Sequence, residues 1–230
     1  MAKDYILSPK DEARLAAWHR QALERKDAGR KEGPCITISR EFGCQAYPLA
    51  AELAKCLGEP WSVVDREILE EAGKVAGFSI EQIEKSRDTP PSLKAIFSMF
   101  LDRSHAEETE LSGPLQEAMR KFAQAGHCII VGCGGVFATR EMKNAFHLRL
   151  VAPYSFRLTK IMNSHGMAEA QARAFIEQHQ QQRDNFITRI AGEPLDDPLH
   201  YHMVLNNSRQ TPVQMAAIIE GALRALGIGD

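Results

Sequence analysis

Residues 35–57 read Cys-Ile-Thr-Ile-Ser-Arg-Glu-Phe-Gly-Cys-Gln-Ala-Tyr-Pro-Leu-Ala-Ala-Glu-Leu-Ala-Lys-Cys-Leu. The β-branched run 36–38 is typical of a strand, and leucines that recur every four residues from Leu49 to Leu57 are typical of a helix. A polar turn that ends at Gly43 separates the two. Because the first amides of a helix lack partners within it and carry the positive end of its dipole, they can bind an anion. The stretch therefore predicts a strand, a loop and a helix, with phosphate as the natural ligand of the loop.

This loop has the frame of a phosphate-binding loop without its consensus, which is Gly-x-x-x-x-Gly-Lys-Ser/Thr. In that consensus the glycines let backbone amides close round the phosphates, the lysine supplies charge and the hydroxyl holds magnesium. Ser39 stands at the first glycine position, Gly43 is the only glycine of the turn, and no Lys, Ser or Thr follows it before the helix. Units of this kind also serve as supports that bind nothing. Spacing alone therefore leaves a phosphate site and a bare scaffold open.

The composition is that of an ordinary globular protein. Of the 230 residues, 44% are hydrophobic and 25% are charged, which suits one α/β domain with insertions. A formal net charge of -2 does not indicate a nucleic-acid binder. No apolar run reaches the length of a membrane span, and the first residues lack the apolar core of a signal peptide. We therefore expect a cytoplasmic protein with neither a nucleic-acid nor a membrane partner.

The five cysteines are odd in number and lie mostly in apolar segments, which is typical of buried, reduced thiols. No Cys-x-x-Cys pair and no metal-ligand spacing among the histidines indicates a structural zinc site. Cys44 differs because a thiolate is stabilised at a helix N-terminus. A small residue that fills a tight turn explains Cys44 more simply.

Four more strands are predicted, each a short apolar or alternating run bounded by turn signals: Trp61–Asp65, His127–Val131, Phe146–Val151 and His202–Asn206. Helical periodicity fills the segments between them, and an amphipathic helix from Thr211 to Leu226 follows the last. Alternating strands and helices predict a three-layer α/β fold with a doubly wound, five-stranded parallel sheet and right-handed crossovers.

The chain divides into an extension and one domain. Residues 1–33 are predicted as a charged helical extension that lies on the core or on a partner, and it could form the contact of a homodimer. Residues 34–230 form the domain. Within it, residues 66–125 carry little strand signal and predict a helical insertion, with an acidic loop at 104–113. The polar residues 178–196 fit a helical lid over a triphosphate and equally a solvated surface helix.

Two further segments lie at positions where a ligand site is expected. Asp65 and Arg66 follow the second strand, and open α/β sheets place ligand-contacting residues at the carboxyl ends of their strands. An N-cap role explains Asp65 equally well. Residues 132–135 hold three glycines after a buried strand, which indicates either the close approach of a backbone or ligand, or a tight turn.

Six segments of the chain occur in a characteristic order and spacing, which is more specific than any one of them: Ile38–Gly43, Val64–Ile68, Ile130–Gly134, Ala152–Pro153 with Phe156–Arg157, Arg183–Asn185 and Tyr201–Ser208. In this order the chain resembles the cytidylate kinase-like family of P-loop nucleoside monophosphate kinases, over roughly residues 34–225.

The resemblance implies a P-loop nucleotide kinase-like fold, with ATP and Mg²⁺ as cofactors if the protein is active. It implies Arg157 and Arg183 as catalytic residues on the transferring group, because phosphoryl transfer depends on positioning and charge neutralisation. On the monophosphate side it implies Asp65, Arg66, Gly132 and Gly134. The phosphates of ATP would contact the loop residues Ser39, Arg40, Glu41, Phe42, Gly43, Cys44, Gln45 and Ala46.

The departures from the family pattern lie in the segments that would bind the phosphates and supply the catalytic cations. The segment 44–47 replaces the family's Ser-Gly-Gly-Arg, so we expect the side chains of Gln45 and Ala46 to crowd the loop. Cys133 replaces an arginine, and three glutamines at 180–182 replace Asp-Lys-Arg. The metal ligands are unknown, since only Glu41 or Asp65 offers a nearby carboxylate. Losing one such arginine can lower turnover by about three to five orders of magnitude, which argues against efficient catalysis.

Three hypotheses therefore stay open. The protein is an ATP-dependent transferase, a kinase that phosphorylates a pyrimidine nucleoside monophosphate. Alternatively, it is a catalytically degenerate relative that binds a nucleotide or another phosphate-bearing small molecule as a sensor or regulatory protein. In the third hypothesis it is a structural homodimer with a vestigial loop.

Overall fold

A computed structural model describes residues 33–64 and 105–228. The predicted N-terminal extension, Asp65, Arg66 and most of the predicted helical insertion lie outside the described residues.

The core of the fold is a parallel sheet, and within the described ranges it has five strands: β1 Cys35–Arg40, β2 Ser62–Val64, β3 Cys128–Val131, β4 Ala145–Val151 and β5 Met203–Asn206. Their order across the sheet is β2-β3-β1-β4-β5, and every pair is parallel. The predicted doubly wound, five-stranded sheet is thereby confirmed. The central strand β1 pairs with β3 on one side and β4 on the other, so the loop after it leaves the middle of the carboxyl edge.

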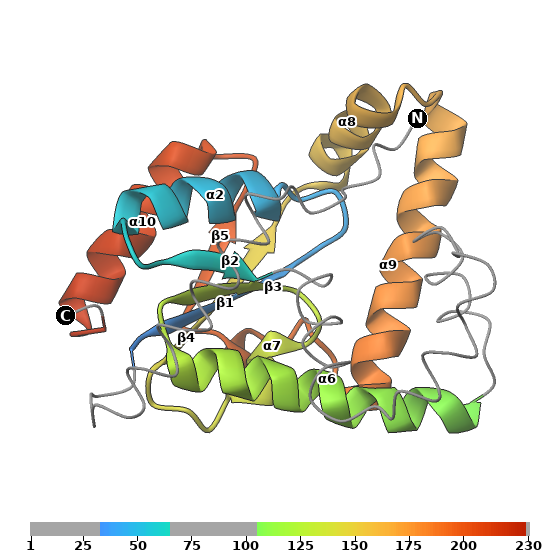
Figure 1. The fold of residues 1–230 in the computed structure, drawn as a ribbon. Coiled ribbons are helices and arrows are strands. Elements are labelled where there is room, and N and C mark those ends of the chain that lie inside the picture. The colour runs from blue at the N-terminus through green and yellow to red at the C-terminus, as the bar shows by residue number, and fades with distance from the viewer. Residues whose placement is uncertain (1–32, 65–104, 229–230) are drawn as a thin grey trace, which may run out of the picture.

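Helices cover both faces of this sheet (Figure 1). On one face lie α2, Ala46–Leu57, and α10, Pro212–Ala225, and on the other lie α6, His105–Ala125, and the short α7, Gly135–Thr139. The side chains of β1 alternate between these faces, as a strand requires. Ile36 and Ile38 pack with α2 and α10, whereas Cys35 packs with α6.

Beyond the carboxyl edge, α8, Tyr154–His165, and α9, Glu169–Ala191, form a helical hairpin. They pack together through Leu158, Ile161, Ala172 and Ile176. The long helix α9 stands beside the sheet in Figure 1 and reaches from α8 to α6, where Gln116 donates to the Ile190 carbonyl oxygen. The second half of α9 belongs to the segment 178–196, predicted as a lid or a surface helix. None of the helices in residues 33–64 and 105–228 is long and apolar enough to cross a membrane.

Local signals explain the element boundaries. Thr211 and Gln214 form a capping box that starts α10, and Gly58, at φ 73°, ends α2. The acidic stretch 105–113, predicted as a loop, instead belongs to α6, because its glutamates favour a helix more than the loop interpretation assumed. The short α7 and the 3-10 turn η1, Pro198–His200, span too few residues for periodicity to reveal them.

Candidate functional site

The candidate site is the loop between β1 and α2, which buried residues hold at both ends. Ser39 is 3% exposed at the end of β1, and Ala46 is 2% exposed at the start of α2. Between them the Cys44 amide donates to the Glu41 carbonyl oxygen at 3.2 Å, and Gly43 takes a positive φ of 91°. The loop is therefore a tight, anchored turn at the carboxyl edge.

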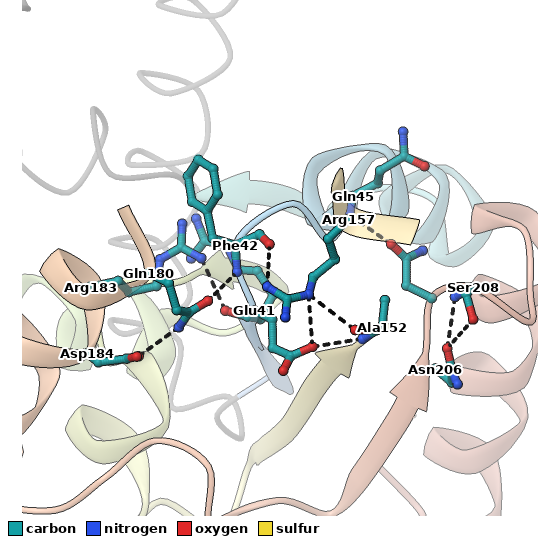
Figure 2. A network of polar contacts seen from close by, with 12 residues as sticks. Glu41, Phe42, Gln45, Ala152, Arg157, Gln180, Arg183, Asp184, Asn206 and Ser208 are labelled. Carbon is teal, nitrogen blue, oxygen red and sulfur yellow. Dashed lines mark hydrogen bonds and ion pairs between the residues drawn. The ribbon is translucent and has the colours of Figure 1, made fainter. Parts of the chain in front are cut away.

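Glu41 and Arg157 fasten this loop to β4 and α8 (Figure 2). The Glu41 carboxylate accepts the Ala152 amide at 2.9 Å and lies 3.5 Å from the Arg157 Nε atom. Arg157 also donates to the carbonyl oxygens of Phe42, at 3.1 Å, and Ala152, at 3.2 Å. Arg157, implied as a catalytic residue, here uses its guanidinium to hold the backbone of the loop.

Two amides of the loop already donate to side-chain oxygens. The Phe42 amide donates to Gln180 Oε1 of α9 at 2.7 Å, and the Gln45 amide donates to Asn207 Oδ1 at 2.9 Å. Asn207 is 3% exposed, and Gln180 is oriented by a hydrogen bond to Asp184. A carboxamide oxygen therefore accepts at each of two positions where a phosphate-binding loop would offer its N–H group to a phosphate oxygen.

The Phe42 side chain joins the loop to α9. Its ring stacks on His179 with 5.0 Å between centroids and meets Phe175 edge to face at 5.6 Å. The Arg183 guanidinium lies over the same ring, 5.2 Å from its centroid. These three residues of α9 are four apart and thus share one face of the helix. The segment predicted as a lid or surface helix therefore packs against the loop in this structure.

Arg40 and Arg183 bring two positive charges to the loop. Arg183 donates from Nη1 to the Arg40 carbonyl oxygen at 3.2 Å. Burial, and next the charge of Arg40, lowers the pKa of Arg183 to about 9, so Arg183 is still charged at neutral pH. Among the described residues, no carboxylate forms an ion pair with either arginine. An anion between them would relieve this repulsion.

The glycine segment after β3 accommodates the first of these arginines. A Cβ atom at Gly132 would lie 1.7 Å from Arg40 Nη1, so only glycine leaves room for this guanidinium. Gly134 faces Ile187 and Ile190 of α9 and is the N-cap of α7. The close approach expected at this segment thus involves an arginine side chain at Gly132 and the helix α9 at Gly134.

Cys44 is a partly buried thiol. Burial, and next the charge of Glu41, raises the pKa of Cys44 to about 11. The thiol therefore stays protonated at neutral pH, and its side chain packs against the core under α2. These contacts fit the interpretation of Cys44 as a small residue that fills a tight turn.

The expected crowding of the loop is wrong. Ala46 packs into the core, and Figure 2 shows the side chain of Gln45 extending away from the contacts of Glu41 and Arg157. Tyr47 is 48% exposed, and Pro48 is exposed as well. The reason is that the helix begins at Ala46, which turns these side chains toward the core or the solvent. Anion binding at the loop is therefore limited by the amides that already donate to side chains, and not by bulky side chains in the loop.

The cofactors implied by the resemblance do not fit the loop as it stands. A triphosphate would need the amides of Phe42 and Gln45, which already donate. In the described part of the chain, no group of three or more His, Cys, Asp or Glu side chains could hold a metal ion. Glu41, the described carboxylate expected nearest to such an ion, is used by Ala152 and Arg157.

Sequence reasoning missed the residues that pair with the loop. The sequence pattern indicates Gln180 only as one of three glutamines that replace a charged triplet, and Asn207 only as part of the segment Tyr201–Ser208. Asn207 follows β5 at the carboxyl edge, where the rule for open α/β sheets places ligand-contacting residues, so this signal could have found it. The spacing of Phe175, His179 and Arg183 was a second signal. No local pattern points to Gln180 rather than to the glutamines beside it.

Comparisons with known proteins agree with this architecture. A family model described as "Cytidylate kinase-like family" matches residues 35–209. No curated protein matches the chain. Among solved structures, an uncharacterized protein from Eubacterium ventriosum has a TM-score of 0.63 at 16% identity, with 84% of this chain and 98% of that chain covered. A shikimate kinase from Bacteroides thetaiotaomicron has a TM-score of 0.48 at 14% identity, with the same two shares covered.

Proposed function

The chain belongs to the cytidylate kinase-like family, and we propose that it binds a phosphate-bearing small molecule at the loop 40–45 without efficient phosphoryl transfer. A nucleotide is the expected ligand, a pyrimidine nucleotide first among them, since that is what the family resemblance implies. The observation that carries the proposal is the pair Arg40 and Arg183. Their two guanidinium groups adjoin the loop, and no ion pair to either exists among the described residues.

An anion is the ligand that such a pair favours. Guanidinium groups match the geometry of phosphate oxygens and bind them with strong, charge-assisted hydrogen bonds. Because Arg183 is largely buried, water screens the repulsion from Arg40 only partly, and a phosphate group would replace this repulsion by attraction. Gly132 supports the same reading, since its missing side chain leaves the space in which the Arg40 guanidinium lies.

Efficient transfer is disfavoured by the tasks that the arginines already perform. Arg157 donates to the Phe42 carbonyl oxygen and Arg183 donates to the Arg40 carbonyl oxygen, so both stabilise the loop. Phosphoryl transfer needs cations and magnesium aimed at the transferring group. The loop lacks the usual lysine and hydroxyl, and its carboxylate, Glu41, already contacts Ala152 and Arg157.

The contact of Gln180 suggests how binding would be sensed. A phosphate oxygen that takes the Phe42 amide must displace Gln180 Oε1, which releases one contact between α9 and the loop. Binding and the position of α9 would then be coupled, as a sensor or regulatory protein requires.

The experiment combines binding and turnover on the full chain. Calorimetry and thermal unfolding are measured with inorganic phosphate, CMP, CDP and ATP, with and without magnesium, and phosphorus NMR follows any product. We expect a raised melting temperature with at least one nucleotide, because a ligand of the folded state stabilises it. We expect no diphosphate formation at a rate typical of kinases, about 1–100 per second.

The variant Arg183→Gln should weaken that binding by about 10- to 100-fold, the loss of one charge-assisted hydrogen bond. Arg173→Gln is the matched control, because Arg173 lies on the same helix but is exposed and pairs with Glu169. Unchanged melting temperatures with every ligand at millimolar concentration would instead favour a vestigial loop. Rapid formation of a diphosphate would show an active kinase.

A further inference from the structure

A pocket among the described residues lies away from the loop 40–45. It has a volume of about 360 Å³ and opens between α7, the turn η1 and the strand β4. His147, the third residue of β4, lies at its base, toward the amino end of the strand. No residue of the loop 40–45 lines this pocket, and neither does Arg157 or Arg183.

The walls of this pocket are largely aromatic rings. Phe137 of α7 and His200 of η1 meet edge to face with 5.0 Å between ring centroids. Tyr201 follows at 6.3 Å from His200, and the ring of His202 lies 5.2 Å from that of His147. Rings arranged in this way offer faces and edges on which another flat ring can pack.

Hydrogen-bond donors accompany these rings. The backbone amide of His147 donates to His202 Nδ1 at 3.0 Å, which fixes neutral His202 with its proton on Nε2. His147 Nδ1 is 2.8 Å from the Thr37 hydroxyl oxygen. Burial, and next the charge of His202, lowers the pKa of His147 to about 4, so His147 is neutral at ordinary pH. A ligand therefore meets a neutral imidazole at His147 and, at His202, a ring whose Nδ1 is already bonded and whose Nε2 can donate.

The charges at the rim disfavour an anion. Arg140 lies 2.7 Å from Glu193 and 3.7 Å from Glu141, so two carboxylates offset its charge. His200 Nε2 lies 3.5 Å from the second oxygen of Glu193. The rim is thus neutral to acidic at pH 7, unlike the loop with its two arginines.

We propose that this pocket binds a neutral, planar heteroaromatic molecule that carries a hydrogen-bond acceptor. Its ring packs against Phe137, His200 and Tyr201, and its acceptor takes the hydrogen bond from His202 Nε2. Since the pocket shares no residue with the loop and its ligand carries no phosphate, this site is independent of the function proposed above.

The test is a titration of the full chain labelled at its histidines, followed by NMR of the imidazole signals. The probes are benzimidazole and nicotinamide as neutral heteroaromatics, benzoate as an anionic ring, and cyclohexanol as a neutral, non-aromatic ring. None of them carries a phosphate group. We expect the heteroaromatics to give saturable shifts at His147, His200 and His202, while the signal of His165 on α8, outside the pocket, does not move.

The variant His200→Ala should weaken heteroaromatic binding by about 2- to 10-fold, the contribution of one aromatic contact. His165→Ala is the matched control and should bind as the parent does. The proposal is overturned if neither heteroaromatic gives a saturable shift up to its solubility limit. Tighter binding of benzoate would overturn the charge argument, and equal binding of cyclohexanol would overturn the selection of a flat ring.

Discussion

The carboxamide oxygen of Gln180 lies 2.7 Å from the backbone nitrogen of Phe42, so a side chain of α9 accepts the hydrogen bond of one amide of the phosphate-type loop. The same loop residue places its ring against α9. Backbone and side chain of Phe42 thus both bind the helix that the sequence indicated as a lid. Any ligand that uses this amide must compete with the protein itself.

Replacing Gln180 by Ala should therefore raise the affinity for inorganic phosphate. The Phe42 amide loses its internal acceptor, and an anion no longer has to break that bond. One net hydrogen bond corresponds to about a 2- to 10-fold gain, measured by calorimetry. Gln181→Ala is the control, because Gln181 is exposed on the same helix. A lower affinity in Gln180→Ala would show that Gln180 assists binding.

Gly43→Ala should destabilise the protein more than Gly192→Ala. Both glycines have positive φ values, 91° and 72°, so both variants carry backbone strain, about 1–2 kcal/mol. At Gly43 the new Cβ would also lie 2.9 Å from Arg157 Cβ and 3.3 Å from its Cα, whereas Gly192 has nothing within 4 Å. Crowding of a helix backbone adds about 1–3 kcal/mol, measured by denaturant unfolding. Equal losses in the two variants would contradict this packing.

Gly132→Ala should act on binding rather than on stability alone. Its φ of 81° is positive, like the 72° of Gly192, so Gly192→Ala is the control that also carries backbone strain but meets no neighbour. The new Cβ displaces the guanidinium of Arg40, which is the movable end of a long side chain. We expect weaker phosphate binding by about 10-fold or more, the loss of one charged contact, in Gly132→Ala only. Unchanged binding in this variant would remove Arg40 from the anion site.

His147 should make stability fall in mild acid. Its pKa is about 4 in the folded protein against about 6.5 when unfolded, so between these values only the unfolded chain takes up a proton. The contribution of neutral His147 to the free energy of unfolding is therefore complete above about pH 6.5. It is lost as the pH falls toward 4, which lowers the free energy of unfolding by about 3 kcal/mol. His147→Gln should remove most of this slope, measured by urea unfolding at several pH values.

A smaller slope should remain in that variant, because the pKa of His179 is lowered as well, first by burial and next by the charge of Arg183. His165→Gln is the control for His147, since His165 is exposed on α8. A full slope in His147→Gln would show that another group governs the acid response.

The fold was largely predictable because its signals are local. A short apolar or alternating run bounded by turn residues marks each strand, and the five predicted strands agree with the observed ones to within about two residues, the usual uncertainty of such boundaries. The same kind of local signal indicates the phosphate-type loop and the glycine segment, whereas Arg183 is indicated by the family resemblance. The partners of the loop amides were not, because Gln180 lies 138 residues from Phe42 and Asn207 lies 162 residues from Gln45.

The sequence by itself determined a parallel, doubly wound α/β domain and, after its first strand, a loop with the frame of a phosphate-binding loop. Only the tertiary structure decided that the amides of this loop donate to two carboxamides and that Arg157 and Arg183 support its carbonyl oxygens. The physical reason is that hydrophobic periodicity specifies which face of a helix or strand is buried. Which polar group meets a given amide depends on how α9 and the segment after β5 pack against the loop, and no short stretch of sequence contains that information.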